Sequence, residues 1–366
     1  MKKINNGAKI AVVSLSSGVA GESFVSHEIK LAYERISRLG YKLVFMDNAM
    51  KGLEFLANNP KAKADDLLQA FCDKDVEMII CAIGGDNAYE ICPYVFENQK
   101  LIDAIKKNPK VFLGFSDSTT NHLIFNKLGL NTYYGQCLLV DIAELDDNML
   151  PYSEKHFKNL LNGFEDKKIE SSNVWYEERK DFSPAALGTK RTSHKETRGY
   201  EVINKPLSPA HGKLFGGCID VIYDLLTGGR HELAKVYNDK YQIFPTDSNF
   251  YKDKILFLET SDSKPTPDEF EKQIEALLNL NVIQSSRAIL FGKPQDEVYF
   301  KEYEEILRKK IKDTPILFNM NFGHALPHAI LPYGRNTKVD FIISRLRFWI
   351  NPLHACDKTN IVVRPR

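Results

Sequence analysis

The sequence has little of what marks a membrane-spanning, secreted or nucleic-acid-binding protein. No segment approaches the ~20 apolar residues of a membrane span, and the apolar run at 10–13 is shorter than the ~7–15 residues of a secretory signal. Lys and Arg number 49 against 48 Asp and Glu, and this formal net charge of +1 provides no electrostatic footprint for nucleic acid or an anionic membrane. We therefore expect a cytoplasmic protein whose partner is a small molecule.

The chain also lacks the cysteine and histidine spacings of common metal sites. Its cysteines include no C-x-x-C pair, and several lie inside apolar runs, which fits buried free thiols in a reducing compartment. The nine histidines show no H-E-x-x-H spacing. We expect no metal ion and no cofactor. The six cysteines are Cys72, Cys81, Cys92, Cys137, Cys218 and Cys356.

The first half of the chain alternates strand-like and helix-like segments. Such alternation predicts a parallel sheet covered by helices. Ligands of these sheets bind beyond the carboxyl ends of the strands. The pattern predicts strands at 9–16, 41–47, 77–83, 110–116 and 131–138, and helices at 26–39 and 63–73.

The apolar pattern lapses between about 165 and 210, and a second αβ unit follows it. The best helix of this unit begins at the capping box Thr266-Pro267-Asp268-Glu269. We therefore predict an α/β fold in two domains. A Rossmann-like N-terminal domain with a parallel sheet spans 1–165, a linker and loop span 166–210, and a C-terminal αβ domain spans 211–366.

The run KVFLGFSDSTTNHLIF at 110–125 leads a predicted strand directly into Ser116 and then into a helix-compatible pattern. A serine at such a corner can expose its hydroxyl, while N–H groups at the helix start face an oxyanion. Ser118 stands where the hydrolase elbow G-x-S-x-G has its second glycine. We interpret Ser116 as a nucleophile, and a helix N-cap is the alternative.

A serine nucleophile needs an imidazole base and an orienting carboxylate. Glu259 lies at the end of the strand-like run in KILFLETSD at 254–262, and His324 lies in a Gly- and Pro-marked loop after another such run. His328, four residues on, competes for the role of base. Ser116, Glu259 and His324 form a triad candidate drawn from both predicted domains, so we expect the active site in the interdomain cleft.

These motifs resemble the LD-carboxypeptidase family of serine peptidases, which includes the microcin C self-immunity peptidases. The resemblance implies Ser116 as nucleophile, Glu259 as the acid and His324 as the general base, and it implies a homodimer. It extends over most of the chain, through KIAVVSLSSG at 9–18, CAIGGDNAYEICPYV at 81–95, GFSDSTT at 114–120, GKLFGGCIDVIYDLLTG at 212–228, LFLETSD at 256–262 and FGHALPHAILPYG at 322–334.

The resemblance also implies an oxyanion hole. Its donors would be the backbone N–H of Asp117 and one from the turn of Gly84, Gly85 and Asp86, where glycines let the backbone approach a ligand closely. A GGD turn after an apolar strand also occurs in lipid kinases and NAD kinases, where it lies against phosphate. Asn87 stands here in place of the glycine customary in those kinases, and a nucleotide-dependent kinase stays as an alternative.

Within the family, two substrate classes compete. The cell-wall enzymes cut before a terminal D-amino acid in murein peptides, whereas the immunity enzymes cut the amide that joins an aminoacyl group to a nucleotide-like phosphoramidate or sulfamate. SSNVWYEERKDF at 171–182 and LFLETSD look more like the immunity branch. That likeness implies Trp175 as the residue that stacks on the nucleobase, and interdomain packing of Trp175 is the alternative.

Three further residues are candidates for contact with substrate. Cys218 stands where some immunity enzymes have Asn, so a side-chain amide contact is absent at that position. Lys264 and Arg335 could serve an anionic group, although lone basic residues in loops are more often solvated. A non-catalytic protein that sequesters nucleotide-peptide ligands is a third functional alternative.

Overall fold

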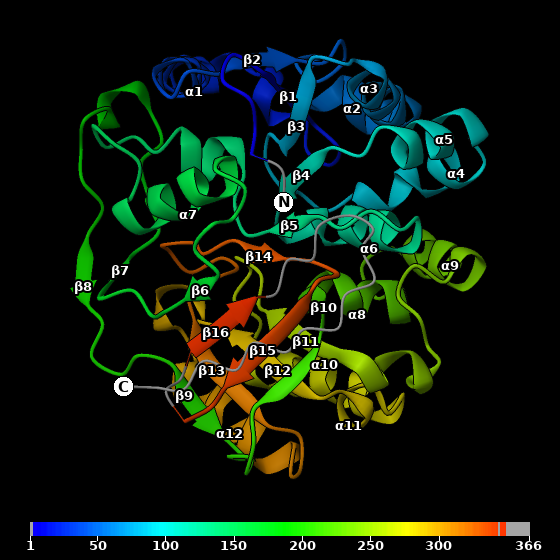
Figure 1. Ribbon diagram of the computed structural model, residues 1–366, viewed down its shortest axis with the longest axis vertical. Helices are drawn as coiled ribbons and strands as arrows, with labels where there is room; N and C mark the ends of the chain where they lie inside the picture. The colour runs from blue at the N-terminus through cyan, green and yellow to red at the C-terminus, as the bar shows by residue number, and fades with distance from the viewer. Residues whose placement is uncertain (1–2, 343–344, 349–366) are drawn as a thin grey trace.

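The protein is described by a computed structural model that covers residues 3–342 and 345–348 (Figure 1). Two sheets form the centres of two αβ halves, the first in the upper part of Figure 1 and the second in the lower part. The predicted α/β fold, with a parallel sheet in the N-terminal region and a second αβ domain, is confirmed. A small two-stranded sheet pairs β7 (Val174–Tyr176) with β8 (Ser193–Lys195).

The N-terminal sheet has the order β14-β5-β4-β3-β1-β2. Its first five strands along the chain are parallel, whereas β14 (Leu331–Pro332) comes from the C-terminal half and pairs antiparallel with β5. One strand of the second half thus completes the first sheet. The five parallel strands are β1 (Lys9–Val13), β2 (Lys42–Phe45), β3 (Val76–Cys81), β4 (Val111–Gly114) and β5 (Tyr133–Tyr134).

All five strands predicted for this half are present, with β5 much shorter than 131–138. The chain turns at Gly135, where φ is 144°, and then enters a helical turn at Leu138–Ile142, so its apolar side chains are buried without strand pairing. The helices of this half are α1 (Ser26–Arg38), α2 (Leu53–Asn58), α3 (Pro60–Cys72), α4 (Cys92–Phe96), α5 (Gln99–Lys107), α6 (Thr119–Lys127) and α7 (Pro151–Leu161).

The second sheet has the order β6-β16-β15-β10-β11-β12-β13-β9, and its four central strands β10 to β13 are parallel. The outer strands pair antiparallel with their neighbours. The strands not yet bounded are β6 (Lys168–Ile169), β9 (Glu201–Ile203), β10 (Ala210–Cys218), β11 (Lys254–Glu259), β12 (Ala288–Gly292), β13 (Ile316–Met320), β15 (Asn336–Asp340) and β16 (Arg345–Phe348).

Helices α8 to α12 belong to this second half. In α10 the predicted capping box is confirmed, since the Thr266 hydroxyl accepts the Glu269 N–H and the Glu269 carboxylate accepts the Thr266 N–H. The five helices are α8 (Ile219–Thr227), α9 (Glu232–Tyr241), α10 (Pro267–Asn279), α11 (Val282–Ser285) and α12 (Phe300–Lys310).

The segment 166–210, predicted as a linker and loop, contributes strands to the structure. It contains β6 and β9 at the two edges of the second sheet, and the β7–β8 hairpin. Each of these strands has only two or three residues with mixed burial, so no apolar alternation marks them in the sequence. The linker description was therefore too simple, while the domain boundaries at 165 and 211 stay a prediction.

Helix α6 lies at the junction of the two halves. All its residues from 119 to 125 are buried, because it packs against β10 and α8 of the second half as well as against its own sheet. A helix that is buried all round has a fixed position. The residue that precedes this helical stretch, Ser116, is therefore held at the interface between the halves.

The cysteines described by the structure are free thiols, of which Cys72 is exposed and the other four are buried. Cys356 lies outside the described residues. No helix in the described part of the chain combines the length and the apolar content that crossing a membrane requires.

Candidate active site

The carboxyl ends of strands from both sheets meet at one point. Ser116 follows β4 of the N-terminal sheet, whereas Glu259 ends β11 and His324 follows β13 of the second sheet. The His324 Nε2 lies 2.9 Å from the Ser116 Oγ, and its Nδ1 lies 2.8 Å from the Glu259 Oε2. The structure thus brings all three predicted triad residues together in one hydrogen-bonded chain.

Ser116 occupies a strained corner. Its φ is 61°, in the left-handed region that non-glycine residues seldom adopt, and such strain persists where the surroundings hold the backbone. The single-turn helix Ser116–Ser118 follows and leads into α6. The Ser116 side chain is half-buried, so a ligand can reach the hydroxyl. The corner resembles a G-x-S-x-G elbow in its backbone conformation, although Ser118 replaces the second glycine.

The geometry fixes the tautomer of His324. In the neutral ring, the hydrogen lies on Nδ1 and donates to Glu259, with Nδ1 also 3.1 Å from the Thr260 carbonyl oxygen, so that Nε2 can accept the Ser116 hydroxyl. Glu259 is fully buried, so it acts on the site through its hydrogen bonds. An imidazole held in this way can take a proton from the serine hydroxyl.

Tyr134 is a member of the site that the sequence analysis did not identify. Its hydroxyl donates to the Glu259 Oε1 at 2.6 Å and accepts the Ser116 N–H at 3.1 Å. Burial and then the Glu259 charge raise the pKa of Tyr134, so the phenol stays a neutral donor. Its place at the end of β5, the neighbour of β4, is the signal that could have identified it.

The electrostatics of His324 follow from Glu259. Burial alone would lower the pKa of His324, but the charge and hydrogen bond of Glu259 outweigh it and raise this pKa to about 9. The Glu259 charge therefore favours the protonated ring. Proton abstraction from Ser116 requires the neutral ring.

The turn after β3 packs directly against Ser116. A Cβ added to Gly84 would lie 2.9 Å from both the Cβ and the Oγ of Ser116, so only glycine fits here. Among the described residues, the Gly85 N–H makes no hydrogen bond to a backbone acceptor, and Asp117 follows Ser116 directly in the single-turn helix. Unpaired N–H groups beside a serine hydroxyl are what an oxyanion hole requires.

The Asp117 side chain connects the loops around the serine. Its buried carboxylate accepts the Ser16 hydroxyl and the Ala88 N–H, the latter at 2.8 Å. Burial raises the pKa of this carboxyl. The Asp86 side chain points to solvent, with 63% of its area exposed, and lies 3.5 Å from the His231 Nε2. Asp86 can therefore contribute its backbone N–H to the site, but its side chain is not part of this buried network.

Trp175 lies in β7 beside the site. The Tyr176 N–H donates to the Leu326 carbonyl, two residues beyond His324, at 3.1 Å. The indole is half-buried and stacks on His194 with 4.2 Å between ring centroids. The Lys293 ammonium also lies over this ring, 5.1 Å from its centroid, and Trp175 as a whole is partly exposed.

The remaining candidates have other partners. The Lys264 ammonium donates to the Asp296 carboxylate at 2.6 Å. The buried Cys218 thiol donates to the Asp220 carboxylate at 3.8 Å, and the Cys218 N–H donates to the Thr119 hydroxyl. His328, the competing base, pairs with the buried Asp141 at 2.8 Å. Arg335 lies away from the triad. Among the described side chains no group of three His, Cys, Asp or Glu could hold a metal ion.

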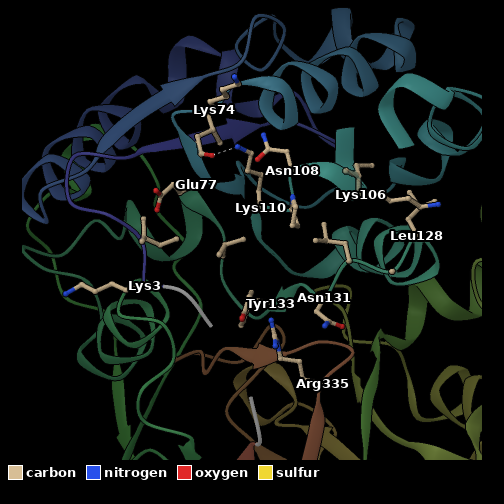
Figure 2. Close-up of a pocket in the computed structure, with 17 residues that line it drawn as sticks. Lys3, Lys74, Glu77, Lys106, Asn108, Lys110, Leu128, Asn131, Tyr133 and Arg335 are labelled. Atoms are coloured by element: carbon tan, nitrogen blue, oxygen red, sulfur yellow. Dashed lines mark hydrogen bonds between the residues drawn. The ribbon is translucent and has the colours of Figure 1, made fainter. Parts of the chain in front are cut away.

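Arg335 lines a cavity of about 870 Å³ at the amino ends of the N-terminal strands (Figure 2). Lys74 and Lys110 lie across this cavity from it, and its walls include no triad residue. The chemistry assembled at the carboxyl ends therefore lies outside this cavity.

Both domains of a known family match the chain. The N-terminal domain of the LD-carboxypeptidase family matches residues 10–135, and its C-terminal domain matches residues 211–339. The crystal structure of an MccF-like protein from Streptococcus pneumoniae in complex with AMP is 43% identical, with a TM-score of 0.90 over 93% of this chain and 98% of that one. This chain belongs to the LD-carboxypeptidase family.

Relatives in sequence carry the names of both branches of the LD-carboxypeptidase family. The microcin C7 self-immunity protein MccF of Escherichia coli is 25% identical over 84% of each chain. A Bacillus subtilis protein named "Probable murein peptide carboxypeptidase" is 29% identical over 91% of this chain and 89% of that one. The family identifies the chain as a peptidase-type protein, while the names leave its substrate open.

We predict that Gly84→Ala abolishes most hydrolase activity. The added methyl group would push against the Ser116 Oγ, and loss of one well-placed oxyanion donor costs ~10²–10³ in kcat. Steady-state kinetics on a cleavable amide substrate measures the effect. Gly229→Ala, where the nearest atom is the Thr227 hydroxyl at 3.4 Å, is the control and should keep full activity. Wild-type turnover by Gly84→Ala would contradict this packing argument.

We predict that kcat/KM rises with pH as His324 loses its proton, with a midpoint near its pKa of about 9. Glu259→Gln removes the charge that raises this pKa, so the acid limb should move to lower pH while the plateau falls. A pH series of kcat/KM for both proteins tests this. An unchanged midpoint in the variant would mean that Glu259 does not control the imidazole.

Proposed function

We propose that this chain is a serine hydrolase that cleaves the amide between an aminoacyl group and a nucleotide-like phosphoramidate or sulfamate. The observation that carries the chemistry is the hydrogen-bonded chain from the Ser116 hydroxyl through His324 to the buried Glu259, with distances of 2.9 and 2.8 Å. Family membership supports peptidase activity, and these hydrogen bonds indicate which residues would carry it out.

In the proposed reaction, His324 Nε2 takes the Ser116 proton as the Ser116 Oγ bonds to the substrate carbonyl carbon. Glu259 holds the ring and stabilises the imidazolium. The carbonyl oxygen becomes an oxyanion, which the N–H groups of Asp117 and the Gly85 turn stabilise. The C–N bond then breaks, the amine leaves with the proton from His324, and an ester on Ser116 remains.

Water completes the cycle. His324, neutral again, takes a proton from water as the water oxygen attacks the ester carbonyl, and the second tetrahedral species collapses to a carboxylic acid and free Ser116. Each half-reaction uses the same base and the same oxyanion donors. Tyr134 supports both by keeping one oxygen of Glu259 and the backbone of Ser116 in fixed positions.

The nucleotide branch is favoured by the relative in complex with AMP, which is 43% identical to this chain. By that likeness, we assign Trp175 to the nucleobase, on which an aromatic ring can stack. The half-buried indole beside the His324 loop supports this assignment. Cys218 and Lys264, being buried and ion-paired respectively, are assigned no contact with substrate.

The second candidate is an LD-carboxypeptidase that acts on murein tetrapeptide. The relative named as a murein peptide carboxypeptidase favours it, since that protein is 29% identical over 91% of this chain. The same triad would serve both substrates. The kinase alternative has less support, because Gly84 packs against Ser116 and the Asn87 side chain accepts the Lys63 ammonium at 2.9 Å.

We predict that the purified protein releases the amino acid from aspartyl sulfamoyl adenosine and leaves murein tetrapeptide intact. Mass spectrometry of both incubations measures the products. Ser116→Ala should lower kcat by several orders of magnitude, on the order of 10⁶, because no other group can form the ester, while substrate binding persists. Cleavage of only the tetrapeptide would favour the second candidate, and wild-type turnover by Ser116→Ala would refute the serine mechanism.

A further inference from the structure

Residues 174–195, which we call the strap, leave the second half of the molecule and reach the first. The strap begins with β7, ends with β8 and joins them through a long, charged connection with one helical turn at Pro184–Ala186. Connections of this length in compact proteins are often functional or mobile. Buried and partly buried polar contacts hold this one to both halves, among them those with Leu326, Asp296 and Glu144, and Trp175 lies at its start.

Two of the holding points are on the second half. The Tyr176 N–H donates to the Leu326 carbonyl at 3.1 Å, in the loop that carries His324. The Glu178 N–H donates to the Asp296 Oδ1 at 2.8 Å, and the other Asp296 oxygen accepts the Lys264 ammonium. These contacts join the first leg of the strap to the loops that follow β11, β12 and β13.

The third holding point is one carboxylate of the first half, Glu144. Its Oε1 accepts the Arg179 Nε at 2.9 Å and Nη2 at 2.6 Å, and its Oε2 accepts the Arg191 Nε at 2.6 Å. The three side chains are only 1%, 6% and 2% exposed respectively. Arg179 lies in the part of the strap that follows β7, and Arg191 lies in the part that leads to β8. Glu144 therefore holds both parts of the strap.

Glu144 is itself held rigidly. The Arg35 guanidinium from α1 donates to the carbonyls of Ile142 and Glu144 at 2.9 and 2.6 Å, and also to the Asp146 carbonyl. Although burial alone would raise the pKa of Glu144, the two strap arginines lower it, so the carboxylate is charged. The contact between a buried carboxylate and two guanidinium groups is strongly directional, because planar Arg groups bind carboxylates in few geometries.

We propose that Glu144 is a positioning residue that sets the affinity for the nucleotide end of the substrate. It does so by fixing the strap that carries Trp175, without touching the substrate or the triad. The inference rests on the proposed function, because it takes the nucleotide as the group that Trp175 meets. Loss of the clamp would leave Ser116, His324 and Glu259 in place while the Trp175 ring loses its fixed distance from them.

The test compares wild type with Glu144→Gln, which keeps the shape and removes the charge. We expect KM for aspartyl sulfamoyl adenosine to rise at least about tenfold, with kcat within about threefold of wild type, as expected for loss of binding that is equal in ground and transition states. The Kd for AMP, measured by calorimetry, should rise by a similar factor. Asp239→Asn, which removes the exposed i,i+4 partner of Lys235, is the control and should change neither constant.

Arg179→Lys provides a second variant if Glu144→Gln does not fold. It keeps the charge but loses the two-point contact, so a smaller rise in KM is expected. Limited trypsin digestion reports the strap directly, since both variants should be cut faster at 179–191 than wild type. A KM and an AMP Kd equal to wild type in a folded variant would overturn the proposal. Absence of turnover and AMP binding in the wild type itself would instead refute the proposed function.

Discussion

A single buried carboxylate, Glu259, joins the two halves of this molecule at the site of its chemistry. One oxygen accepts the His324 Nδ1–H, and the other accepts the Tyr134 hydroxyl. His324 continues to the Ser116 hydroxyl and Tyr134 to the Ser116 N–H, so two arms from one acid converge on one serine. A buried charge is costly unless it is fully paired. The hydrogen bonds that offset the cost of burying the Glu259 charge are therefore the same ones that orient the base and the nucleophile.

The chain separates its chemistry from the selection of its substrate. The family matches cover 10–135 and 211–339, which contain all the residues of the proposed triad and oxyanion hole. The interval between these matches holds Glu144 and the strap with Trp175. A hydrolase can keep one catalytic arrangement while the segment that meets the distal part of the substrate varies. In this account the strap carries the group that meets the distal part of the substrate, and Glu144 holds the strap in place.

The sequence was sufficient for the site wherever a strand runs directly into a polar residue. The apolar runs before Ser116, Glu259 and His324 end at the edges where the halves meet, and the three signals together with the family resemblance suggested one site. Tyr134 was missed because a tyrosine in an apolar run is indistinguishable from a core residue. The strap was described as part of a linker and loop because its two strands have only three residues each, too few to show an apolar alternation. Lys264 was proposed as a substrate contact because of its charge. Its ion pair with Asp296 could not be predicted, because Asp296 lies 32 positions away in the sequence.

The most direct test of the central claim is the rate and location of labelling by a fluorophosphonate, which reacts with activated serines. The account predicts one adduct, on the peptide that contains Ser116, formed at a rate that rises with pH as His324 loses its proton. Fully labelled protein should have no amidase activity. An adduct on another residue, or undiminished turnover by protein labelled at Ser116, would contradict the relay from Glu259 through His324 to Ser116.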